Sequence, residues 1–182
     1  MESCTGYLFV HFTGEEKLGE QIYFALSRDG LHWMDLNNGS PVLLSDIGEK
    51  GVRDPFILRN PLNGRYVIIA TDLRIEAGKG WKAAEEAGSR NLIVWESEDL
   101  IHWDGPFSHE VGIPGAGCVW APEALYMYEN PLYGKRKYAA WLLPPLLPLL
   151  WMPRIQEIPA LLHPKLLPAP IHTPPRGFQP RG

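Results

Sequence analysis

Asp54 is the residue of this sequence whose setting most suggests chemistry. It lies between Arg53 and Pro55, directly before an apolar run, in the segment "GVRDPFIL". A proline fixes its own backbone and holds the preceding residue out of the α region, which helps to aim the Asp54 side chain. Two interpretations follow. Asp54 is either an acid in a surface turn before a strand, or a carboxylate directed into a pocket to do chemistry.

Three further residues are candidates for the same site. Asp72 closes the apolar segment "IIATD", and Trp120 and Glu123 lie in "VWAPEA". An aspartate at the end of a strand is usually a turn former. Glu123 carries the carboxyl group that general acid catalysis needs, and a tryptophan offers a flat apolar face.

Composition argues against several classes of function. The net charge of −4 and the pI near 5.9 give no reason to expect a nucleic-acid or anionic-membrane partner. Cys4 and Cys118 are far apart and in no CxxC pattern, so we expect neither a disulfide nor a zinc site. The first residues lack the basic segment and long apolar run of a secretory signal. We therefore expect a cytoplasmic protein, or an extracellular one if the true start lies elsewhere.

The elements that must position these residues are short strands. Turns and polar segments separate runs rich in β-branched and aromatic residues, which predict an all-β fold. The segment 75–90 is more polar, and we expect a loop with a short helical piece there. The expected strands are 7–12, 21–27, 55–60, 65–72 and 91–97.

An internal repeat supports the all-β prediction. The pattern S-x-D-x-x-H-W occurs at 27–33 and again at 97–103, each time after an apolar strand. Repeats at a period of several tens of residues in an all-β chain favour a propeller, whose blades are four-stranded sheets. We expect the serine and aspartate to hydrogen-bond the turn backbone, and the histidine and tryptophan to pack between blades.

The sequence changes character after Gly134. Residues 135–182 contain 11 of the 18 prolines, seven basic residues and one acid, Glu157. Their many leucines follow no strand or helix period, and prolines interrupt every apolar run, so a membrane span is not expected. We expect residues 1–134 to form a partial β-propeller domain and 135–182 an irregular Pro/Leu-rich tail. A partner-binding tail is one interpretation, and a non-native reading frame or mis-spliced end is the preferred one.

Taken together, these motifs resemble glycoside hydrolase family 43. The resemblance covers most of residues 5–134, an N-terminal part of the family's domain. It implies a five-bladed β-propeller, of which this chain supplies about two to three blades. It also implies inverting hydrolysis of arabinose- or xylose-containing plant polysaccharides, without a cofactor, and it leaves an axial calcium ion open. The matching segments are 7–15, 53–55, 64–72, 97–103 and 119–130.

An inverting glycosidase needs a carboxylate that deprotonates water and a carboxylic acid that protonates the leaving oxygen, about 6.5–9.5 Å apart. The resemblance implies that Asp54 is the general base. Arg53 would hold a sugar hydroxyl or lower the pKa of Asp54, or else pair with a surface acid. Asp72, Trp120 and Glu123 would line the sugar site.

The sequence departs from the family downstream of "VWAPEA". The family's general acid lies in a later Glu-Gly-Pro-like motif, with a third carboxylate between, and neither motif occurs here. General acid catalysis contributes about 10²–10⁴-fold. We therefore expect this polypeptide to be inactive or nearly so, and marginally stable, so that its standing as an enzyme is open.

Two rival interpretations remain. Residues 33–39, "WMDLNNG", resemble the W-M-N-D-P-N-G motif of fructan-cleaving propellers, but lack its Asp-Pro core. Alternatively, the chain is a non-catalytic carbohydrate-binding or interaction module that uses its aromatic residues and its tail.

Overall fold

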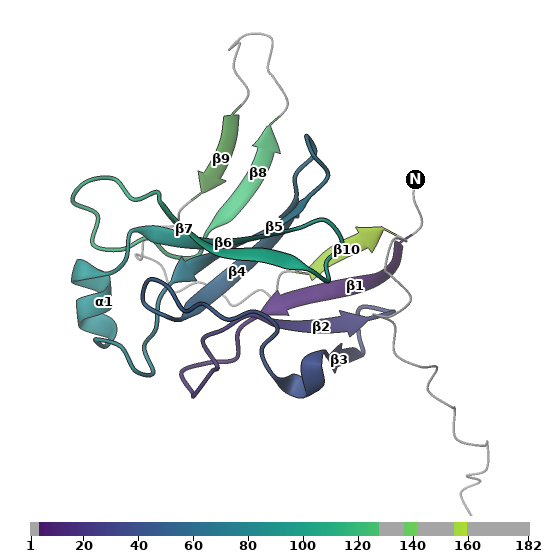
Figure 1. Cartoon of the computed structure of the whole chain (residues 1–182), viewed down its shortest axis with the longest axis horizontal. Coiled ribbons are helices and arrows are strands. Elements are labelled where there is room, and N and C mark those ends of the chain that lie inside the picture. The colour runs from purple at the N-terminus through teal and green to yellow at the C-terminus, as the bar shows by residue number, and fades with distance from the viewer. Residues whose placement is uncertain (1–3, 128–136, 142–154, 160–182) are drawn as a thin grey trace, which may run out of the picture.

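The computed structural model describes residues 4–127, 137–141 and 155–159. Within them the chain is mostly β-strand, with one short α-helix and one 3₁₀ turn (Figure 1). The all-β prediction is confirmed. The elements are β1 (Cys4–His11), β2 (Tyr23–Ser27), β3 (Trp33–Asp35), η1 (Asn37–Gly39), β4 (Val52–Arg59), β5 (Tyr66–Asp72), α1 (Trp81–Ala87), β6 (Asn91–Ser97), β7 (Trp103–Glu110), β8 (Glu123–Met127), β9 (Lys137–Trp141) and β10 (Ile155–Pro159).

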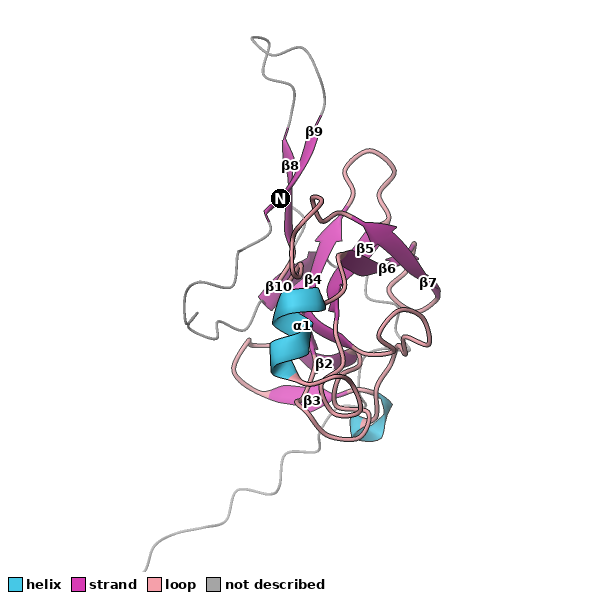
Figure 2. Ribbon diagram, turned by 90° about the vertical axis from the view of Figure 1, so that its left-hand side faces the viewer, coloured by secondary structure: helices cyan, strands magenta, loops and turns pink. Residues whose placement is uncertain are grey.

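The strands form antiparallel sheets of the kind expected of a partial propeller. One four-stranded sheet has the order β10-β1-β2-β3, and a second has the order β4-β5-β6-β7. A third sheet contains β8 and β9. In Figure 2 the helix α1 lies outside the sheets, in front of the strands. Its position agrees with the short helical piece predicted within 75–90.

The two larger sheets are built by the same alternation of side chains. In the first sheet, Leu8 and Val10 of β1 pair with Leu26 and Phe24 of β2, and all four are buried. In the second, Ile68 and Ala70 of β5 pair with Trp95 and Ile93 of β6, again all buried. Because successive side chains on a strand point to opposite faces, each sheet presents one apolar face. These faces join in one core cluster.

The repeated motif forms the same turn in both sheets. Ser27 Oγ accepts the backbone N–H of Gly30 at 2.8 Å, and Asp29 Oδ1 accepts that of His32 at 2.9 Å. Ser97 and Asp99 make the equivalent bonds at 2.8 Å each. The predicted role of the serine and aspartate is confirmed.

The predicted packing of the histidines is wrong. The side chains of His32 and His102 are 87% and 86% exposed, and each contacts the aspartate of its own turn at 2.7 Å. In each turn, the aspartate three residues before the histidine accepts the backbone N–H of the histidine and also contacts its imidazole. These contacts hold the ring at the surface. Trp103 packs as predicted, since its ring lies 5.8 Å from Phe24 of the other sheet.

The repeat also aligns the two sheets strand by strand. The turn joins β2 to β3 in the first sheet and β6 to β7 in the second. By this correspondence β1 is the counterpart of β5, and β10 takes the place that β4 takes in the second sheet. Strands β9 and β10 lie within the segment predicted as an irregular tail. The other residues of 135–182 lie outside the described part of the chain. In the described part, no helix is long and apolar enough to cross a membrane.

Candidate functional site

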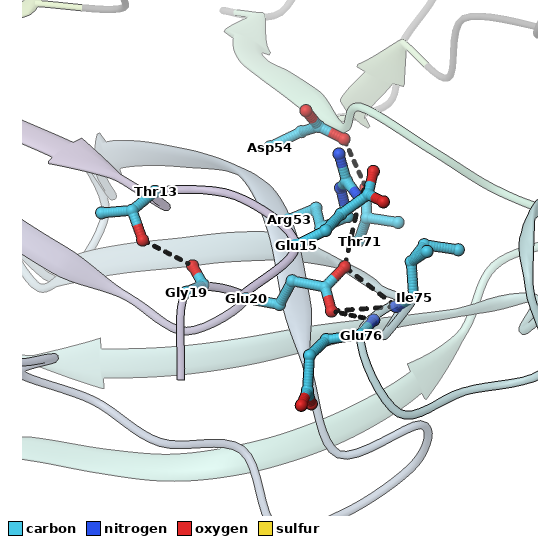
Figure 3. Close-up of polar contacts among 9 residues, drawn as sticks. All are labelled: Thr13, Glu15, Gly19, Glu20, Arg53, Asp54, Thr71, Ile75 and Glu76. Carbon is cyan, nitrogen blue, oxygen red and sulfur yellow. Dashed lines mark hydrogen bonds and ion pairs between the residues drawn. The ribbon is translucent and has the colours of Figure 1, made fainter. Parts of the chain in front are cut away.

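Asp54 lies at a distortion near the beginning of β4. The pairing of β4 with β5 shifts register between Arg53 and Phe56, so Asp54 falls in a bulge. Its backbone has φ of 48°, a left-handed conformation that is uncommon for a residue with a side chain. The hydroxyl of Thr71 donates to Asp54 Oδ2 at 3.4 Å (Figure 3). Bulges re-aim side chains and cluster near active sites, so this backbone supports a directed carboxylate.

The beginning of β8 repeats this backbone. Ala121 precedes Pro122 as Asp54 precedes Pro55, and its φ is 49°. The N–H of Ala121 donates to Thr71 Oγ1 at 2.9 Å. Thr71 is fully buried. One hydroxyl therefore accepts from the start of β8 and donates toward Asp54, which joins the beginnings of two neighbouring strands.

Arg53 is held by protein groups on several sides. Its guanidinium contacts Glu20 at 3.1 Å and Glu15 at 3.3 Å. The same group lies over the rings of Phe12 and Trp81, 4.9 and 4.8 Å from their centroids. Ion pairs and cation–π contacts together fix a planar guanidinium in one place. The proposed contact of Arg53 with a sugar hydroxyl stays a prediction.

Glu20 is a partner that sequence inspection did not single out. It is 3% exposed, and its carboxylate accepts the backbone N–H groups of Ile75 and Glu76 at 2.9 Å, besides contacting Arg53. A buried charge is tolerated when it is paired and hydrogen-bonded. Glu20 lies in a polar stretch between two strands, where nothing local marks it as buried.

Asp72 is separated from this cluster. Thr71 and Asp72 are neighbours on β5, so their side chains point to opposite faces. The carboxylate of Asp72 is buried and accepts from Ser89 Oγ at 2.6 Å and from the N–H of Glu49 at 2.8 Å. Burial raises the pKa of this carboxyl, and the two hydrogen bonds offset only part of the shift. Its predicted role in sugar binding stays untested.

Trp120 and Glu123 lie at the beginning of β8, and their expected role in lining a sugar site stays a prediction. Trp120 is half-buried, and its ring makes an edge contact with Trp81, at 6.0 Å between centroids and 80° between planes. Its indole N–H is buried and has no hydrogen-bond partner in the described part of the chain. Glu123 is half-buried and is the first residue of β8. Trp81 was missed because it lies in a polar segment without strand periodicity.

Two other expectations concern metal ions and fructan-cleaving enzymes. Among the described residues, no group of three His, Cys, Asp or Glu side chains could hold a metal ion. Asp35 of "WMDLNNG" is exposed and lies in β3, the outermost strand of the first sheet. That edge is opposite to the position that corresponds to β4, so the fold argues against Asp35 as an inner-strand nucleophile.

The site brings a carboxylate, a threonine hydroxyl and two tryptophans to the beginnings of β4 and β8. A carboxylate can transfer protons, and a tryptophan ring can pack on the apolar face of a sugar. This combination is compatible with a protein that acts on carbohydrates. The chain belongs to the family described as Probable glycosyl hydrolase domain, related to glycoside hydrolase family 43, whose model matches residues 2–139. The predicted resemblance is therefore confirmed.

A curated relative agrees with this assignment. The chain is 36% identical over 129 residues to an alpha-L-arabinofuranosidase of Bifidobacterium longum subsp. longum. The match covers 67% of this chain but 12% of the length of the relative. No solved structure matches the chain.

Proposed function

We propose that this chain carries the general base of an inverting glycosidase that acts on arabinose-containing polysaccharides. The base is Asp54, and the observation that carries the proposal is its left-handed backbone in a bulge before Pro55, with Thr71 donating toward its carboxylate. Strained backbone of this kind persists where the surrounding structure demands it, and it clusters at catalytic sites. The likeness to an arabinofuranosidase favours arabinose over xylose.

In the proposed reaction, Asp54 takes a proton from a water molecule, whose oxygen attacks the anomeric carbon. The bond from that carbon to the leaving oxygen breaks as an acid protonates the oxygen, and the configuration inverts. No Asp follows Pro131, and the one later Glu is Glu157. We infer that this polypeptide binds sugar but hydrolyses it poorly or not at all.

Binding and hydrolysis are tested separately on the full chain. Calorimetric titration with an arabinose-containing oligosaccharide is expected to show binding that Asp54→Asn weakens about tenfold, because a charge-assisted hydrogen bond is lost. Asp46→Asn is the matched control, since it removes an exposed carboxylate elsewhere. No release of p-nitrophenol from p-nitrophenyl α-L-arabinofuranoside above the buffer rate is expected.

Two results would contradict the proposal in different ways. Absence of any binding by the unmodified chain would remove the carbohydrate function. Hydrolysis abolished by Asp54→Asn would confirm the base but refute the inferred inactivity. In that case Glu123→Gln identifies whether Glu123 supplies the proton.

A further inference from the structure

Trp81 is a large aromatic side chain that the fold fixes in place yet leaves 41% exposed. It is the first residue of α1, in the connection 73–90 between β5 and β6. The repeat pairs this connection with 12–22, between β1 and β2, which is shorter and contains no helix. The extra length is about that of α1. The helix is therefore an addition to the repeated unit, and Trp81 is its largest side chain.

The Trp81 ring is held by two contacts. The guanidinium of Arg53 lies over the ring, 4.8 Å from its centroid, and the ring of Trp120 meets it edge to face. Arg53 is itself fixed by Phe12 and Glu20. Leu31 and Ile113 are more exposed, at 79% and 74%, but they are aliphatic and offer no flat ring. Holding an aromatic ring in one orientation at the surface prepares it to bind a flat partner without further loss of conformational freedom.

The two residues that contact the Trp81 ring are sequence neighbours of groups at the proposed base. Arg53, beneath Trp81, directly precedes Asp54, and Trp120 directly precedes Ala121, whose N–H binds the hydroxyl that donates to Asp54. Figure 1 shows α1 on the side from which β4 begins. Asp54 is half-buried, whereas Trp81 is 41% exposed.

We propose that Trp81, supported by Trp120, forms a second sugar subsite that stacks on the ring next to the sugar bound at Asp54. The subsite rests on the proposed function and adds to it a preference for oligosaccharides over single sugars. The ligand class follows from the geometry. An exposed, rigid indole packs on the apolar C–H face of a sugar ring, while hydroxyls at the edge of that ring stay in water.

The variants Trp81→Ala and Trp81→Phe test the subsite in the full chain. Calorimetry with an arabinose tetrasaccharide should give a dissociation constant about tenfold higher for Trp81→Ala. Trp81→Phe keeps a ring over Arg53 and should recover most of the affinity. The affinity for free L-arabinose should stay unchanged in both variants. Phe107→Ala removes an equally exposed ring, 45% exposed on β7, and should change neither affinity.

A second measurement needs no variant. Oxidation of exposed tryptophans by N-bromosuccinimide, mapped by peptide mass spectrometry, should modify Trp81 in the free chain. The tetrasaccharide should protect Trp81 and L-arabinose should not. Unchanged oxidation together with unchanged tetrasaccharide affinity in Trp81→Ala would overturn the subsite and leave the role of Asp54 standing. A wild-type chain that binds neither sugar would overturn the proposed function, and the subsite with it.

Discussion

At the scale of single residues, one buried hydroxyl and two carboxylates decide how the site is arranged. Thr71 orients Asp54, while its neighbour Asp72 faces the other way and ties two loops together. Gly48 has φ of 59°, and a Cβ there would collide with the Asp72 carboxylate, so the loop approaches as closely as it does because this residue is glycine. The two aspartates thus differ in role although both lie near a strand end.

Asp72 is expected to make stability depend on pH. Its pKa in the folded protein is raised above the ordinary value of 3.8, chiefly by burial. The folded state therefore binds more protons than the unfolded state between these two values. The stabilisation is complete below the unfolded pKa and is lost as the pH rises through the folded pKa.

Asp72→Asn removes this titration while keeping an oxygen that accepts from Glu49 N–H. The free energy of unfolding of the wild type, relative to that of Asp72→Asn, should fall as the pH rises above about 4 and through the raised pKa of Asp72. Urea unfolding at several pH values measures it, with Asp46→Asn as the control for losing one surface charge. A difference that stays constant with pH would disprove the role of burial.

At the scale of elements, the repeated turn is the device that shapes both sheets. In each copy a serine hydroxyl accepts two backbone N–H groups, and the aspartate two residues later accepts two more. The pKa of Asp99 lies well below its ordinary value, chiefly because its carboxylate accepts a hydrogen bond from the backbone N–H of His102. The backbone N–H of His32 lowers the pKa of Asp29 in the same way. These bonds replace the ladder bonds that the chain loses where it reverses.

Ser97→Ala tests this account of the turn. Ser97 is 1% exposed, so its loss leaves two N–H groups without their acceptor and should lower the free energy of unfolding by about 1–3 kcal/mol. Ser27→Ala, with the same geometry, should cost a similar amount. Ser40→Ala, at an exposed serine, should change stability by less than about 0.5 kcal/mol. Chemical denaturation measures all three, and a Ser97→Ala cost equal to that of Ser40→Ala would refute the account.

At the scale of the whole molecule, charged and aromatic pairs connect segments that are distant in sequence. Arg53 of β4 binds Glu20, which precedes β2, and Trp103 of β7 packs on Phe24 of β2. The same arginine supports Trp81 beside the proposed sugar site. Arg53 therefore links the connection before β2 to the helix that carries Trp81.

Arg53→Met should be strongly destabilising, because it leaves the carboxylate of Glu20 buried without its cation. We expect a loss of about 3–5 kcal/mol, toward the lower end since two backbone amides still bind Glu20. The double variant with Glu20→Gln buries no charge and should recover part of the loss. Arg59→Met, at an exposed arginine of the same strand, is the control. Urea unfolding decides, and a double variant less stable than Arg53→Met would contradict the interpretation.

Much of the fold follows from the sequence alone, because local patterns encode it. Apolar runs with turn residues between them indicated β1, β2, β4, β5 and β6, and the S-x-D-x-x-H-W repeat indicated equivalent turns. The strands β3 and β7 were not predicted, since β3 has only three residues, β7 is largely polar, and their pairing with β2 and β6 defines them. Likewise, the exposure of His32 and His102 follows from a contact within each turn.

The sequence by itself determined the family and the all-β class, and it pointed to Asp54 as the candidate base, because a motif and its order survive without coordinates. The tertiary structure decided which groups contact Asp54 and its neighbour Arg53. Thr71, Glu20 and Trp81 come from separate connections and strands, and no local pattern marks them. Only long-range pairing brings such residues together, and the same pairing turns Asp72 to the opposite face of its strand.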